Sequence, residues 1–388
     1  MPEARGYLKA LLNNLRRIRE RAALSPSALE ERLILGPGWI NRFETGETVP
    51  SIDMVLALLH ETGGELEQLL EGLPDPEASE VERCIFAEEA GDNIIINFRY
   101  ANFDAQYKLA NSTLDDFEAV IKTLRDGLAR LANFDQSQSE AIKTDSVART
   151  FLIAVNRWPH VSPSDLWWFL VYRAYCDPYN HPAHYARLDF TQSWKRTGGW
   201  ALEEILVRHY GPFLKTQGVN LFIADGAAKQ KLVGALALSD RVEPDKIDVV
   251  LTGDTPNGPR FFGVVHVKAS FAERRTDDVP LSIALGRGGF TSPLWTMDCK
   301  STPGAKPVNR GELGDVNGHR SAKRKDIEDE GYFTGCFSYN KHTQPSPGTL
   351  PTDRRVYVCD FANPEDMFSR FIVQRWRKFR STSRVGHR

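Results

Sequence analysis

The stretch from Asp245 to Arg275 constrains the fold of this chain more than any other. It reads DKIDVVLTGDTPNGPRFFGVVHVKASFAERR, with two short apolar runs on either side of a turn rich in Gly, Pro and Asn. This pattern predicts two strands joined as a hairpin. An aspartate lies at the start of the first strand and a lysine at the end of the second. An acid and two arginines follow the lysine. Charges in these places indicate that the hairpin interacts with a ligand outside its sheet.

The pairing of the two strands predicts which of these charges meet. Side chains alternate across a strand, so Val264, His266 and Lys268 share one face of the second strand. Antiparallel pairing would bring Asp248 and Lys268 to the same end of the hairpin. A surface ion pair worth little would account for most isolated Asp/Lys pairs. It does not account for the apolar strands, for an upstream helix that carries Glu203, or for the charged cluster that follows.

An acid and a lysine at one strand edge suit the hydrolysis of a phosphodiester. This reaction is very slow in water, so an enzyme must neutralise the phosphate, activate a water and stabilise the leaving alkoxide. A divalent cation held by carboxylates can do all three, and a nearby lysine can orient or deprotonate the water. We therefore interpret Asp248 as a metal ligand at the scissile phosphate of DNA.

Residues 7–70 have the pattern of a compact bundle of short helices. Apolar residues recur at helical spacing in the first segment, Ser25 and Pro26 begin a second helix, and Ser51 caps a helix that stops at Gly63. The string GWINRFETGETVPSIDMVLALL resembles the phage-repressor (Cro-like) helix-turn-helix domain. Its third helix ends in an I-x-R-x-E-x-G pattern, which is matched here by Ile40, Arg42, Glu44 and Gly46.

The start of this third helix leaves the role of the domain open. Family members that read operators generally carry polar side chains there, whereas this chain has Gly36, Pro37 and Gly38. Arg42 is our candidate for a DNA contact. The alternative is that the domain serves dimerisation or simple packing.

Changes in composition predict three domains. Residues 71–82 read as an acidic linker, and two alternating apolar stretches followed by a helix from Asp115 form a small module. An aromatic-rich segment begins at Ser146, and a helix opened by Gly198 and Gly199 carries Glu203 near its first turn. The predicted domains are a helix-turn-helix domain at 1–72, a hairpin-plus-helix module at 83–145 and a larger domain at 146–388.

The hairpin also resembles a known motif. IDVVL and VHVKAS look like the PD-(D/E)-x-K nuclease motif, with Asp248 as the leading acid and Lys268 as the lysine. Glu203, in GGWALE, matches the extra acid that such nucleases often carry on the preceding helix. The tail KASFAERR is similar to the K-x-S-…-(D/E)-R sequence of type II restriction endonucleases of the CCGG family, which recognise CCGG or interrupted CC-GG targets.

The resemblance implies a fold, an activity and roles for single residues. The fold would be α/β, a mixed sheet flanked by helices, and the activity Mg²⁺-dependent cleavage of both DNA strands leaving 5′-phosphates. Lys268 would be catalytic, Glu273 would accept from cytosine and Arg274 would donate to guanine, with Ser270 and Arg275 as adjacent DNA contacts. Arginine suits guanine O6 and N7 and a carboxylate suits cytosine N4, each pairing contributing about 1–3 kcal/mol of discrimination.

Two positions depart from the family's pattern. His266 stands two residues before the lysine, where these nucleases carry an acid, Ser or Thr, and we interpret it as a core residue rather than a ligand. Ser282 stands where CCGG enzymes often place an acid on the following helix, but Asp277 and Asp278 lie closer to the lysine. Asp278 therefore joins Asp248 and Glu203 as a candidate metal ligand. The alternative is that Asp278 caps a helix beginning near Pro280.

Charge and composition set the expected partners. The net charge of −2 of the whole chain is unfavourable for binding nucleic acid. Two segments are locally basic, because 300–325 and 361–388 each carry seven Lys or Arg against two acids. No signal-peptide core or membrane-length apolar run is present, and five scattered cysteines form no CxxC pair. We expect a cytoplasmic protein with buried thiols. A palindromic DNA site would require at least a homodimer.

Two other functions fit parts of the sequence. The chain could be a DNA-binding transcriptional regulator, with the helix-turn-helix as the functional part and a C-terminal domain that senses a ligand. It could also be a nuclease of repair or of modification-dependent defence, which would share Asp248 and Lys268 but not a fixed unmodified target.

Overall fold

The computed structural model describes residues 2–72, 83–100, 103–133, 136–182, 188–235, 244–270, 275–300, 307–314 and 320–385. It divides into two compact units, Met1–Val81 and Glu82–Arg388. No helix among these residues is both long enough and apolar enough to cross a membrane.

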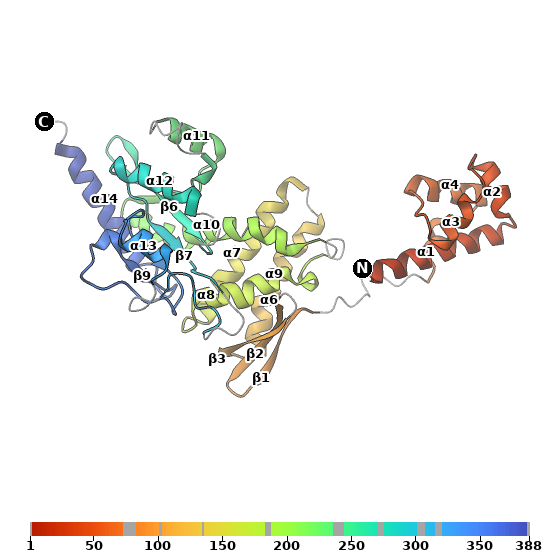
Figure 1. Ribbon diagram of the computed structural model, residues 1–388, viewed down its shortest axis with the longest axis horizontal. Coiled ribbons are helices and arrows are strands. Elements are labelled where there is room, and N and C mark those ends of the chain that lie inside the picture. Colours follow the sequence, from red (N-terminus) through yellow and green to blue (C-terminus); the bar gives the residue numbers. More distant parts are fainter. Residues whose placement is uncertain are drawn as a thin grey trace. The chain divides into compact units, whose positions relative to one another are not determined.

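The N-terminal unit is a bundle of short helices, as predicted (Figure 1). Its helices are α1 (Pro2–Arg21), α2 (Pro26–Arg32), α3 (Trp39–Thr45), α4 (Ile52–Thr62) and α5 (Leu66–Leu70). The expected caps are present, because the side chains of Ser25 and Ser51 accept backbone N–H groups at the starts of α2 and α4. Gly63 ends α4 in the left-handed conformation. The side chains that close the core are Leu12, Leu15, Ile18, Leu29, Ile40, Phe43, Leu58, Leu59 and Leu69.

The second unit begins with a small antiparallel sheet that packs on a helix. The sheet consists of β1 (Ile85–Ala90), β2 (Asn93–Tyr100) and β3 (Phe103–Ala110), and α6 (Leu114–Ala129) follows. The predicted pairing of the second and third strands is confirmed. The first strand was missed because IFAEEA lacks the apolar alternation that marks a strand.

Helices from the middle of the chain form the next layer. They are α7 (Ser139–Arg157), α8 (Pro163–Asp165), α9 (Tyr172–Cys176) and α10 (Phe190–Thr216), with a π-helical turn at Leu166–Val171 before α9. Short 3-10 turns occur at Arg130–Asn133, Gln136–Gln138, Pro178–Asn180, Pro244–Lys246 and Thr352–Arg354.

The predicted start of α10 is wrong. The helix begins at Phe190, where Asp189 accepts the backbone N–H groups of Thr191 and Gln192, and it continues through Gly198 and Gly199. A Cβ at Gly198 would lie 3.0 Å from the ring of Trp194, so this glycine permits close packing within the helix. Glu203 therefore lies in the middle of α10, and the charge of its carboxylate does not act on a helix N-terminus.

A mixed sheet forms the centre of the second unit. Among the described residues its order is β4-β5-β6-β7-β8-β9, with β4 (Val219–Phe222), β5 (Val249–Thr255), β6 (Gly258–Lys268), β7 (Leu294–Thr296), β8 (Cys336–Ser338) and β9 (Val356–Val358). The pairs β4–β5 and β5–β6 are antiparallel, whereas β6 to β9 pair in parallel. The predicted hairpin is thus confirmed, and its second strand joins the two halves of the sheet.

Both faces of this sheet are covered. Alternate residues of β5 and β6 enter different cores: Val249, Val265 and Val267 belong to the large core, and Val250 and Val264 to a second core. The second core includes residues of α11 (Gly226–Ala235) and α12 (Arg275–Arg287). The remaining helices are α13 (Ala322–Glu328) and α14 (Met367–Val385). Burial on both faces is typical of parallel strands.

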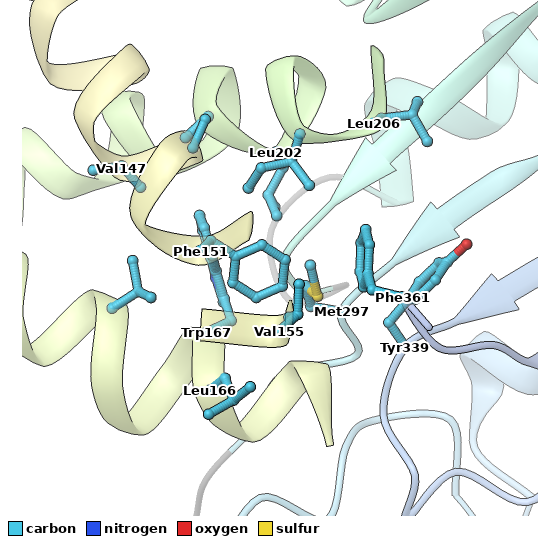
Figure 2. Close-up of a cluster of buried hydrophobic side chains, with 14 of the residues drawn as sticks. Val147, Phe151, Val155, Leu166, Trp167, Leu202, Leu206, Met297, Tyr339 and Phe361 are labelled. Carbon is cyan, nitrogen blue, oxygen red and sulfur yellow. The ribbon is translucent and has the colours of Figure 1, made fainter. Parts of the chain in front are cut away.

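The large core joins the middle helices to the sheet. Figure 2 shows Phe151 of α7 and Trp167 of the π-helical turn beside Met297, which follows β7, and Phe361. The ring of Phe151 packs edge-on against Trp167 at 5.5 Å and against Phe361 at 5.3 Å. Residues of the small module at 83–145 contribute to this same core. The predicted domain boundary at 145/146 therefore lies inside the second compact unit. The division of this unit into a module at 83–145 and a domain at 146–388 stays a prediction.

We predict that Gly253→Ala destabilises the second unit. A Cβ at Gly253 of β5 would lie 2.2 Å from the buried indole of Trp376, so the sheet or α14 would have to move. We expect a loss of about 1–3 kcal/mol in the free energy of unfolding, measured by denaturant unfolding with tryptophan fluorescence. The control is Gly286→Ala in α12, which meets no atom within 4 Å and should gain up to about 1 kcal/mol. Equal effects of the two substitutions would contradict the packing.

Candidate active site

Asp248 lies immediately before β5 and is fixed to the opposite strand. Its Oδ2 accepts the backbone N–H of Val267 at 2.8 Å and the ammonium of Lys268 at 2.8 Å. Only 6% of its surface is exposed. The backbone bond holds the carboxylate at the end of the hairpin, which is where strand alternation had placed it.

Lys268 ends β6 and connects two carboxylates. Its Nζ lies 2.8 Å from Asp248 Oδ2 and 3.3 Å from Asp278 Oδ1, and only 8% of the residue is exposed. Charges buried to this extent lose much of their hydration, and mutual pairing offsets that loss. The ammonium therefore makes it possible for two carboxylates to lie close together in the interior.

Asp278 reaches this pair from α12. The helix begins at Arg275 and contains Pro280, so the prediction of a helix start near Pro280 is wrong, and so is the alternative that Asp278 is its N-cap. Proline prefers the first helical turn but can lie further inside at the cost of one hydrogen bond. The placement of Asp278 inside the helix directs its carboxylate to the end of β6. Burial raises the pKa of Asp278, but His266 and Lys268 outweigh it and hold the pKa below its usual value.

His266 completes the cluster from a position two residues before the end of β6. The residue is fully buried, as the interpretation of a core residue requires, and its Nε2 lies 2.8 Å from the hydroxyl of Ser292. Its Nδ1 has no hydrogen-bond partner among the described residues and lies 3.7 Å from Asp278 Oδ1. One ligand atom each from Asp248, His266 and Asp278 lie within 4.8 Å of one another. Two carboxylates and an imidazole in this arrangement fit a divalent cation.

Glu203 does not join this cluster. It lies on α10, half-buried, and its carboxylate is not part of the group formed by Asp248, His266 and Asp278. The neighbouring Glu204 pairs with Arg208 at 2.7 Å. The assignment of Glu203 as a catalytic acid and metal ligand stays a prediction.

The predicted DNA-contacting residues are only partly described. Ser270 follows β6 and is half-buried. Glu273 and Arg274 lie outside the described residues, and Arg275 is described only as the first residue of α12. Arg42 is half-buried on α3, where its guanidinium lies 4.5 Å from the ring centre of Trp39.

Two serines around the cluster have structural roles that sequence reasoning missed. Ser282, at the position where an acid was expected, donates to the carbonyl of Tyr332 at 2.6 Å and is buried. Ser292 contacts His266 across 26 positions of the chain. No local pattern could have found Ser292, because only the parallel pairing of β6 with β7 brings it to the histidine.

Comparisons with known proteins agree with this architecture. A model described as a helix-turn-helix domain matches residues 10–71. The type II restriction enzyme AgeI of Thalassovita gelatinovora is 37% identical over 237 residues, which cover 59% of this chain and 83% of AgeI. The fold prediction, helices of a helix-turn-helix unit followed by a mixed sheet flanked by helices, is confirmed.

One solved structure gives the same result. The crystal structure of a specific complex of AgeI with DNA aligns with a TM-score of 0.62 at 31% identity, covering 75% of this chain and 99% of that one. A pre-specific complex of the restriction endonuclease BsaWI with DNA aligns with a TM-score of 0.31 at 17% identity, covering 67% and 92%. Only the first similarity is high enough to support an argument about the fold.

We predict that the carboxylate of Asp248 stabilises the second unit. Asp248→Ala leaves the ammonium of Lys268 and the N–H of Val267 without this acceptor, so we expect the free energy of unfolding to fall by about 3–5 kcal/mol. Asp248→Asn should lose less, because an amide oxygen can still accept the N–H. The measurement is denaturant unfolding without divalent cations.

The matched control is Asp254→Ala, on the strand β5 that follows Asp248. Asp254 is exposed and accepts from Asn220 at 2.8 Å, so its removal should change stability by less than about 1 kcal/mol. If both alanine variants were equally stable, the buried carboxylate would contribute no more than a surface one.

Proposed function

The chain belongs to the type II restriction endonucleases, and we propose that it hydrolyses both strands of DNA at a short CCGG or interrupted CC-GG site. The proposed reaction requires Mg²⁺ and leaves 5′-phosphates. The observation that carries this proposal is the buried cluster of Asp248, Lys268 and Asp278 at the end of β6. The similarity to the restriction enzyme AgeI favours this proposal over the alternative of a transcriptional regulator.

The residues of the cluster have distinct roles in this proposal. Asp248 and Asp278 would hold the metal ion, with Glu203 as a further acid from α10. When bound, Mg²⁺ supplies positive charge for the phosphate and lowers the pKa of a water. Lys268 Nζ lies within 3.3 Å of both carboxylates, so the same ammonium can orient a water beside them and stabilise developing negative charge.

Sequence reading is assigned to the segment that follows Lys268. Glu273 would accept from cytosine N4 and Arg274 would donate to guanine O6 and N7, with Ser270 and Arg275 as adjacent contacts. Support comes from the sequence, because these residues follow the proposed catalytic Lys268 within seven positions. The complex of AgeI with DNA is consistent with double-stranded DNA as the partner.

Cleavage of both strands implies more than one copy of the chain. A palindromic site has two-fold symmetry, so a homodimer or a higher oligomer would place one cluster at each scissile phosphate. The helix-turn-helix unit at 10–71 would then either contact DNA through Arg42 or hold the assembly together.

We predict that Lys268→Ala abolishes cleavage but keeps DNA binding. Wild-type protein with Mg²⁺ should cut unmethylated phage DNA into discrete fragments, and the variant should cut at least about 10²-fold more slowly because the water loses its positioning group. A gel-shift assay checks binding. The control is Lys122→Ala, which removes an exposed lysine paired with Asp126 on α6 and should cut normally.

The pattern of products separates the proposal from its rival. A smear, or uncut unmethylated DNA, would favour a repair or modification-dependent nuclease. Cleavage by Lys268→Ala at the wild-type rate would show that the active site lies elsewhere.

We predict that Arg274→Ala weakens site-specific binding. Loss of a bidentate contact to guanine should cost about 1–3 kcal/mol, which corresponds to about 5- to 150-fold in affinity for the specific site. Competition gel shifts with specific and unrelated duplexes measure the ratio. An unchanged ratio would remove Arg274 as a base-reading residue.

A further inference from the structure

His266 differs from the other members of the cluster in having one satisfied nitrogen and one unsatisfied nitrogen. Nε2 lies 2.8 Å from Ser292 Oγ, whereas Nδ1 has no hydrogen-bond partner among the described residues. The ring is fully buried. An unpaired polar atom in the interior is unfavourable, and a ligand bound to it would compensate for the missing partner.

The position of Nδ1 fits coordination better than hydrogen bonding. It lies 3.7 Å from Asp278 Oδ1, which is beyond hydrogen-bond length. Two ligand atoms bound to one cation at about 2.1 Å lie about 3 Å apart when adjacent and about 4.2 Å apart when opposite. The observed separation falls between these limits, and a ligand atom of Asp248 lies within 4.8 Å of both.

The contact at Nε2 also suits a metal ligand. A histidine that binds a metal through one nitrogen usually donates its other N–H to an acceptor, which fixes the tautomer and the ring. The hydroxyl of Ser292 can accept such a bond, and this leaves the lone pair of Nδ1 directed at the carboxylates. The position of Lys268 Nζ, in contact with both Asp248 and Asp278, shows that the same place accepts positive charge.

We propose that His266 Nδ1 is a metal ligand beside Asp248 and Asp278, and that this nitrogen shifts the site toward first-row transition metals relative to Mg²⁺. Mg²⁺ prefers oxygen ligands, whereas Mn²⁺ and, more strongly, Co²⁺ accept imidazole nitrogen. The inference rests on the proposed function, because it concerns the metal site of that reaction. The competing explanation is that His266 is a packing residue without a ligand.

The test is a titration of the full-length protein with Co²⁺, followed by visible absorption, and with Mg²⁺, followed by calorimetry. His266→Ser should lower the affinity for Co²⁺ by about 10- to 100-fold and alter the Co²⁺ spectrum. The affinity for Mg²⁺ should change by less than about 3-fold. An unchanged Co²⁺ affinity and spectrum would overturn the proposal.

A second variant separates a lost ligand from a damaged core. His266→Asn keeps a polar group near the position of Nδ1 but replaces nitrogen with oxygen as the ligand atom. It should retain Mg²⁺ binding and lose the preference for Co²⁺. If both variants lost affinity for Co²⁺ and for Mg²⁺ to the same extent, His266 would be a packing residue and not a metal ligand. Thermal unfolding without metal shows whether each variant is folded.

The matched control is His60→Ala, which removes an exposed histidine of α4 and should leave the Co²⁺ titration unchanged. Digestion of DNA with Mg²⁺ keeps the two proposals apart. Wild-type protein that cuts with Mg²⁺ while His266→Ser binds Co²⁺ normally would contradict this inference alone. Protein that binds Co²⁺ through His266 but never cuts DNA would contradict the proposed function alone.

Discussion

The contact of Lys268 with Asp248 and Asp278 is the interaction on which the rest of the site depends. It joins the start of β5, the end of β6 and the helix α12 through one ammonium. Two buried carboxylates this close would repel each other without a cation between them. The same charge arrangement that holds these elements together also produces a place where a divalent cation can bind.

The sheet explains why this place lies where it does. β6 pairs antiparallel with β5 and parallel with β7, so its last residues lie where the pairing in the sheet changes from antiparallel to parallel. Helices cover both faces, and the edge beyond the carboxyl ends of parallel strands is the usual location of a ligand site. His266 and Lys268 share the face covered by α12, and for this reason Asp278 of α12 lies close to both.

The chain combines this sheet with a separate helix-turn-helix unit. Its relative AgeI is covered almost completely, 99% of that structure, by three quarters of this chain. The helix-turn-helix unit adds a second element of a type that binds DNA in other proteins.

Local patterns in the sequence determined the helix-turn-helix bundle, the hairpin and the meeting of Asp248 with Lys268, because caps and strand alternation act over a few residues. They misplaced the starts of α10 and α12, since packing against Trp194 and the sheet overrides the preferences of Gly198 and Pro280. Only the tertiary structure brought Asp278 and Ser292 to His266. Parallel pairing and helix placement depend on contacts far apart in the chain, which no short-range periodicity records.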